Sequence, residues 1–170
     1  MAVRPGIDEL VPLYYEALYR YAYRLTGSAS DADDLTQETF FAAQTKGHQL
    51  REPERVRSWL FSILHNAFLL MQRRKRQTKS IAWEEWLEEE LCEAEPFIPS
   101  ITDEQLQAAL LAIPADSRAI LVLFYFEDFS YREIADQLSL PIGTVMSRLA
   151  RAKRFLKQQL VGHAEDEEAE

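Results

Sequence analysis

The strongest constraint on the fold of this chain is the segment from Ser130 to Leu160, which has the pattern of two short helices joined by a tight turn. Ser130 and Glu133 have the S-x-x-E spacing of a capping box, which is typical of a helix start. Pro141 disfavours helical backbone at Leu140 and ends this first helix. A second helix follows, with apolar residues recurring at helical spacing. The segment therefore predicts a helix-turn-helix.

The second helix of this segment separates apolar from basic positions. Val145, Leu149 and Ala152 fall on one side, which we expect to face the domain core. The opposite side carries arginines and small residues without any acid, and such a side fits the major groove of DNA. A basic surface helix at the end of a helical bundle is the alternative interpretation.

The charge of the chain is acidic overall but strongly segregated. There are 28 acidic and 19 basic residues, giving a net charge of −9. Basic residues cluster at 73–79 and 148–157, whereas acidic residues fill 84–95 and 165–170. Because a local basic surface governs contact with phosphates, the net charge does not exclude nucleic acid as a partner.

Composition limits the class of protein. The 170 residues are 47% hydrophobic and can bury a core, but they contain no apolar run long enough to span a membrane. The first residues do not form a secretion leader, and a single cysteine excludes an internal disulfide. We expect a soluble, cytoplasmic, all-α protein without membrane insertion.

The periodicity predicts two small helical domains joined by an acidic linker. Domain one is expected at 1–76, with helices from Ile7 to Leu25, from Ser28 or Ser30 to about Thr45, and from Pro53 into the basic run. The linker is expected at 77–101, the second domain at 102–161 and an acidic tail at 162–170. The apolar stripe expected to bury the third helix is Val56, Leu60, Ile63, Leu64, Ala67 and Leu70.

Two interpretations of the linker remain open. Its residues 83–91 mix tryptophan and leucine with glutamate, so they can form an amphipathic segment that lies against a domain and hinders DNA binding. A solvated acidic spacer fits equally well.

No constellation for catalysis or metal binding is present in the sequence. The acids at 31–38 lack further ligands at metal-binding spacing, and the start of a capped helix explains them. There is no P-loop, no dinucleotide-binding glycine motif and no nucleophile motif. We expect a protein that is not an enzyme and that needs no cofactor or metal.

Four motifs resemble one known family. The stretches 31–41 and 58–66 are similar to the second domain, and the stretches 131–135 and 143–152 to the fourth domain, of bacterial extracytoplasmic-function (group 4) sigma factors of the sigma-70 family. The resemblance covers about 7–76 and 102–160, in the family's order. It implies a promoter-specificity subunit that binds core RNA polymerase, reads an upstream element as duplex and opens a downstream element.

The resemblance also implies roles for particular residues. The clamp helices of polymerase are expected to bind Asp31, Asp34, Gln37, Glu38 and Phe41. The upstream duplex is expected to contact Thr144, Met146, Ser147, Arg148, Ala150, Arg151 and Arg154. The opened, single-stranded downstream element is expected to contact His65, Asn66, Arg73, Arg74 and Arg76, with the loop 46–54 helping to hold a flipped base. An anti-sigma factor is an expected further partner.

The chain departs from the family pattern near the predicted promoter site. Leu70 stands where the family usually has an Asp four residues after Asn66, and Gln44 replaces a common Trp. We expect Leu70 to have become a packing residue. Trp59 and Phe61 are candidates for stacking on single-stranded bases, although core packing is favoured for Trp59.

Two other functions compete with this interpretation. A helix-turn-helix regulator acting without polymerase would dimerise on a two-fold symmetric operator. A sigma-like decoy would sequester an anti-sigma factor without touching DNA, and it would have no use for the basic faces at 73–76 and 148–154.

Overall fold

The computed structural model describes residues 6–76 and 101–167, and within these ranges every regular element is helical. The expectation of an all-α fold is therefore confirmed. Most of the predicted linker, including its segment 83–91, lies outside the described residues.

The first domain consists of α1 (Ile7–Thr26), α2 (Ala29–Lys46) and α3 (Val56–Arg76). Gly27 ends α1 with the left-handed backbone of a C-cap, at φ +68°. Ser28 then caps α2, because its side chain accepts a hydrogen bond from the Asp31 amide. The third helix was predicted from Pro53, but Pro53–Arg55 forms a short 3-10 turn, and a second such turn covers Gly47–Gln49.

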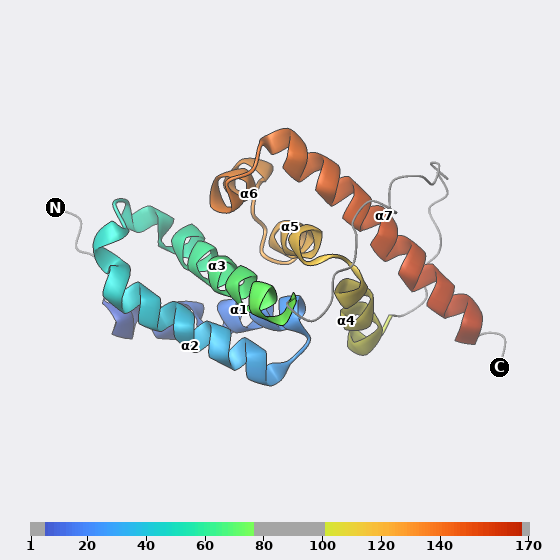
Figure 1. Ribbon diagram of the computed structural model, residues 1–170, viewed down its shortest axis with the longest axis horizontal. Coiled ribbons are helices and arrows are strands. Elements are labelled where there is room, and N and C mark those ends of the chain that lie inside the picture. The colour runs from blue at the N-terminus through green and yellow to red at the C-terminus, as the bar shows by residue number, and fades with distance from the viewer. Residues whose placement is uncertain (1–5, 77–100, 168–170) are drawn as a thin grey trace.

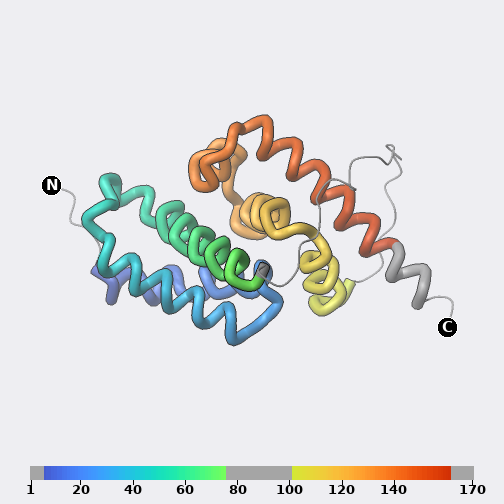
Figure 2. The backbone as a smooth tube through the Cα atoms, in the orientation of Figure 1, coloured from blue at the N-terminus to red at the C-terminus, as the bar shows by residue number. Residues whose placement is uncertain are grey.

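The second domain consists of α4 (Asp103–Ala112), α5 (Ala115–Tyr125), α6 (Tyr131–Leu138) and α7 (Ile142–Glu167). The predicted capping box of Ser130 with Glu133 is formed, and Thr102 with Gln105 forms a second one at the start of α4. The backbone of this domain can be followed from α4 to α7 in Figure 2. The bounds of α7 extend to Glu167, whereas the acidic tail was expected to begin at residue 162.

The burial of α3 corrects the predicted stripe. The residues of α3 that are most buried are Val56, Leu60, Phe61, Leu64, His65 and Phe68. Leu70 is 44% exposed instead of packed. Residues four apart lie on the same side of a helix, so Leu70 shares the exposed side of Asn66. Phe61 is fully buried, so it is not available for stacking on bases, whereas Trp59 packs partly against the core as favoured.

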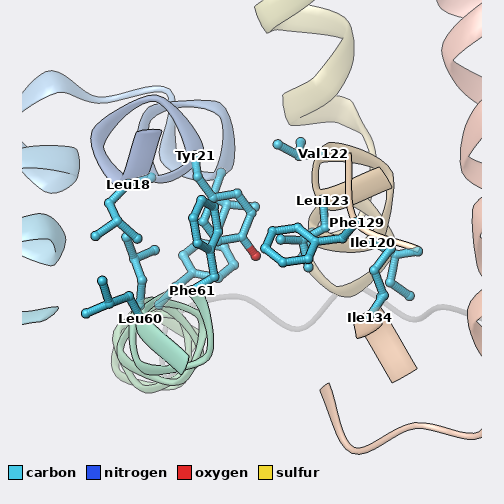
Figure 3. Packing of buried hydrophobic residues seen from close by; sticks show 14 of the residues in the cluster. Leu18, Tyr21, Leu60, Phe61, Ile120, Val122, Leu123, Phe129 and Ile134 are labelled. Carbon is cyan, nitrogen blue, oxygen red and sulfur yellow. The ribbon is translucent and has the colours of Figure 1, made fainter. Parts of the chain in front are cut away.

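The two domains pack directly against each other (Figure 1). The C-terminal part of α1 contacts α4 and α5, and α3 contacts α6. One continuous group of buried side chains runs from Leu18 in α1 to Ile134 in α6 (Figure 3). Sequence analysis had predicted two domains but no direct contact between them.

Candidate polymerase and nucleic-acid interfaces

The exposed side of α2 presents acidic, amide and aromatic side chains together. Asp34, Gln37 and Glu38 are exposed, and the ring of Phe41 is 68% exposed. The opposite side of α2 is buried and includes two threonines, whose hydroxyls each donate to a backbone carbonyl of the preceding turn at 2.7 Å. The buried side of α2 packs against its own domain and fixes the orientation of the helix. The exposed side of α2 therefore faces solvent.

Asp31, at the start of α2, differs from the other residues of this predicted set. Its carboxylate is 2.7 Å from the ammonium group of Lys75, and its side chain is partly buried. This ion pair joins the first turn of α2 to the last turn of α3. Asp31 therefore has a structural partner already, whereas Asp34, Gln37, Glu38 and Phe41 form the open acidic face.

The exposed side of α3 carries polar and basic residues along one line. Asn66, Arg73 and Arg74 are exposed, with Leu70 between them. Arg76 is the last residue of α3, and its side chain is outside the described atoms. The predicted downstream-element residues Asn66, Arg73 and Arg74 thus share an accessible surface.

His65, which was expected to contact DNA, does not belong to this exposed surface. Its side chain is only 6% exposed, and its Nδ1 lies 3.3 Å from the hydroxyl oxygen of Tyr21 in the core. Burial lowers the pKa of His65 to about 4, although the carboxylate of Asp116 opposes the shift. Since one residue is a rotation of about 100° in a helix, His65 and Asn66 face different environments.

The loop before α3 is held at one apolar point. Leu50 is buried, while His48 and Gln49 are exposed. The guanidinium of Arg55 pairs with the carboxylate of Glu52 at 2.7 Å. The backbone of this loop is therefore anchored, and its polar side chains are exposed next to α3.

The helix-turn-helix presents its predicted outer side to solvent. Met146 is 50% exposed, and Ser147, Ala150, Arg151 and Arg154 are also exposed. The inner residues Val145, Leu149 and Ala152 are buried, as predicted.

The turn between α6 and α7 orients α7 so that its inner side is buried and its outer side is exposed. It is made by Ser139 in the left-handed region, at φ +53°. Two predicted contact residues are less open: Thr144 is partly exposed, and Arg148 lies 4.0 Å from the carboxylate of Asp116.

The described part of the chain contains no group of three or more histidines, cysteines or acids that could hold a metal ion. None of the helices described has the length and apolar character required to cross a lipid bilayer.

The chain combines a three-helix domain that has an open acidic face with a helix-turn-helix that has an open basic face. These features define a class of two-domain helical DNA-binding proteins. Two family models match this chain: sigma-70 region 2 over residues 10–78 and sigma-70 region 4 over residues 103–156. The chain therefore belongs to the sigma-70 family, in its extracytoplasmic-function group.

Individual relatives agree with this assignment. The ECF RNA polymerase sigma factor SigE of Mycolicibacterium smegmatis is 37% identical over 169 residues, which is 97% of this chain and 65% of that protein. This chain thus spans slightly less than two thirds of the length of SigE. The RNA polymerase sigma factor YlaC of Bacillus subtilis is 30% identical to this chain. The match covers 98% of this chain and 99% of YlaC.

A solved structure has a similar arrangement of both domains. The sigma factor RpoE of Bartonella quintana, in complex with the anti-sigma factor NepR, matches with a TM-score of 0.72 and 26% identity. The match covers 90% of this chain and 95% of that one.

Sequence analysis missed the residues that join the two domains. Arg57, Gln107 and Arg118 were not among the residues predicted to have a role. Their partners lie 70 or more residues away along the chain. Local spacing carries no signal for contacts at that separation.

Proposed function

We propose that this chain is a cytoplasmic transcription initiation factor that binds core RNA polymerase and directs it to promoters. The observation that carries the proposal is the presence of two open faces of opposite charge on one chain. The acidic face of α2 suits a basic protein surface, and the basic face of α7 suits duplex DNA.

The open acidic face of α2 binds the clamp helices of polymerase. Asp34 and Glu38 attract basic residues and orient the encounter. Phe41, largely exposed in the free chain, provides the apolar contact that becomes buried on binding.

The outer side of α7 reads the upstream element in the major groove. Arg151 is placed to contact a base edge, and Arg154 to contact phosphate. Arg148 joins the phosphate contacts by leaving Asp116, because a partly exposed pair at 4.0 Å is weak.

The exposed side of α3 engages the opened downstream element. The amide of Asn66 can pair with a base edge, while Arg73 and Arg74 neutralise the backbone. The exposed residues of the loop before α3 lie on the same domain and help to hold a flipped base.

An anti-sigma factor regulates the chain in this proposal. Support comes from the likeness to RpoE, whose solved structure is a complex with the anti-sigma factor NepR. The likeness extends over both domains, so the same kind of partner suits this chain.

The test of the polymerase contact is a binding titration with core RNA polymerase. The double variant Asp34→Lys/Glu38→Lys should weaken binding about tenfold or more, because two attractive charges become repulsive. The matched control Glu9→Lys/Glu16→Lys makes the same charge change at exposed sites of α1 and should bind like the unmodified chain. Equal affinities for all three proteins at moderate salt would refute the assignment.

A further inference from the structure

Leu70 is an exposed apolar residue within a surface that is otherwise polar and basic. Its side chain is 44% exposed, and Asn66, Arg73 and Arg74 are exposed as well. Residues three and four apart on a helix are neighbours, with Cβ atoms about 5 to 6 Å apart. Leu70 therefore lies between the amide group and the two guanidinium groups that we assign to the downstream element.

The packing of α3 keeps Leu70 at the surface. Leu64 and Phe68, on the inner side of this helix, are fully buried. In the last turn of the helix, the ammonium group of Lys75 pairs with the carboxylate of Asp31 at 2.7 Å. Because α3 cannot rotate to bury Leu70 without exposing these inner residues, the leucine stays in contact with solvent in the free chain.

The surroundings of Leu70 indicate what kind of group it can contact. One exposed leucine is ordinary by itself. The 21 residues of α3, however, include no Asp or Glu, so no acid of this helix repels a phosphate backbone. Leu70 stands where the family usually has an Asp, and it offers a bound strand an apolar contact instead of a charge or a hydrogen bond.

Asn66 by itself leaves the identity of the bound base open. An Asn side chain has one acceptor oxygen and one donor NH₂ group, and turning the amide over exchanges their positions. It can pair with O4 and N3–H of an unpaired thymine or, turned over, with the amino group and N3 of an unpaired cytosine. Arg73 and Arg74 contact the backbone, which carries no information about the base. The polar residues of this surface therefore do not distinguish the two pyrimidines.

A methyl group does distinguish them. Thymine carries a methyl group at C5, next to the carbon that bears O4. When the O4 and N3 edge of a thymine pairs with Asn66, this methyl group lies beside the paired edge. Leu70 is one helical turn from Asn66, about 6 Å along the axis, so its side chain is placed to contact a group beside the base that Asn66 holds.

We infer that Leu70 makes thymine the base that is captured beside Asn66, by contacting its C5 methyl group. The inference rests on the proposed function, because the opened downstream element has to reach α3. Asn66 holds the base edge, Arg73 and Arg74 hold the backbone, and Leu70 selects the base.

The test compares DNA that differs by one methyl group. Core polymerase with the full chain is titrated with promoter DNA whose downstream element is held open by mismatches, and each thymine there is replaced in turn by deoxyuridine. At one position, the loss of the methyl group should weaken binding about threefold to fivefold, which is the effect of burying one methyl group. Cytosine at that position should bind more weakly than 5-methylcytosine by a similar factor.

Variants show whether Leu70 is the side chain that reads the methyl group. Leu70→Ala should bind thymine and deoxyuridine equally at that position, whereas Leu70→Met keeps the apolar volume and should retain the preference. Because Leu70 is exposed, both variants should fold like the unmodified chain. The matched control Leu13→Ala removes a leucine that is 71% exposed on α1, and it should retain the full preference for thymine.

The possible results separate this inference from the proposed function. If no position prefers thymine to deoxyuridine, or if the preference persists in Leu70→Ala, the role of Leu70 is wrong, while the chain still brings polymerase to the promoter. If the unmodified chain forms no complex of polymerase with any candidate promoter, the proposed function and the role of Leu70 are both wrong.

Discussion

His65 and Asn66 are neighbours in the chain, yet they have opposite environments. His65 is buried beside Tyr21, and Asn66 faces solvent with Arg73 and Arg74. The family resemblance led to the expectation that both residues contact DNA, but it did not indicate which of them is exposed. That exposure depends on which side of α3 packs against α1, which is a tertiary property.

The burial of His65 predicts a dependence of stability on pH. The folded pKa of about 4 is below the ordinary value of about 6.5, so between these values the unfolded chain binds more protons. The contribution is complete above pH 6.5 and is lost as pH falls toward 4. Between pH 7 and pH 5, the free energy of unfolding should therefore fall by about 2 kcal/mol more in the unmodified chain than in His65→Gln. Urea unfolding at both pH values measures this, and parallel pH profiles would contradict it.

The exposure of Leu70 predicts tolerance of a charge. Leu70→Asp should change the free energy of unfolding by no more than about 0.5 kcal/mol, since the carboxylate stays in water. Leu64→Ala, at a fully buried position of the same helix, should cost about 2 to 5 kcal/mol and serves as the positive control. Denaturant unfolding compares the variants. A loss for Leu70→Asp that approaches the loss for Leu64→Ala would restore the original prediction of a packed Leu70.

At the scale of the element, the helix-turn-helix was the part best predicted from sequence. Its capping box, its turn at Ser139–Pro141 and its inner residues depend on spacings of a few residues. Such short-range rules largely determine a small helical motif. The pairing of Arg148 with Asp116 could not be predicted in this way, because it depends on how α5 crosses α7.

The outer side of α7 predicts two distinct effects on promoter binding. Arg151→Ala should cost about 1 to 3 kcal/mol and relax the preference at one base pair, because it removes a base contact. Arg154→Ala should weaken binding to all sequences alike and reduce the salt slope by about one, because it removes a phosphate contact. Titrations of the polymerase-bound chain against a set of substituted upstream elements measure both effects. Identical sequence profiles for the two variants would contradict this division of roles.

At the scale of the whole molecule, the structure adds the direct contact between domains. The resemblance and the helical periodicity predicted both domains, but Arg118 and Leu25 are 93 residues apart in the chain. Their pairing depends on how the two domains pack against each other, which local spacing does not encode. The described contacts between the domains lie between α1, α3, α4, α5 and α6, and the predicted amphipathic segment 83–91 is outside the described residues.

The central claim is that this chain gives core RNA polymerase its choice of promoter, and run-off transcription tests that claim most directly. Purified core polymerase, a set of candidate promoters and the full chain should give transcripts of defined length from a subset of promoters, and Asp34→Lys/Glu38→Lys should abolish them. Polymerase without the chain should give none of these products. The account would be contradicted if the chain bound a two-fold symmetric DNA site without polymerase and supported no transcript from any promoter.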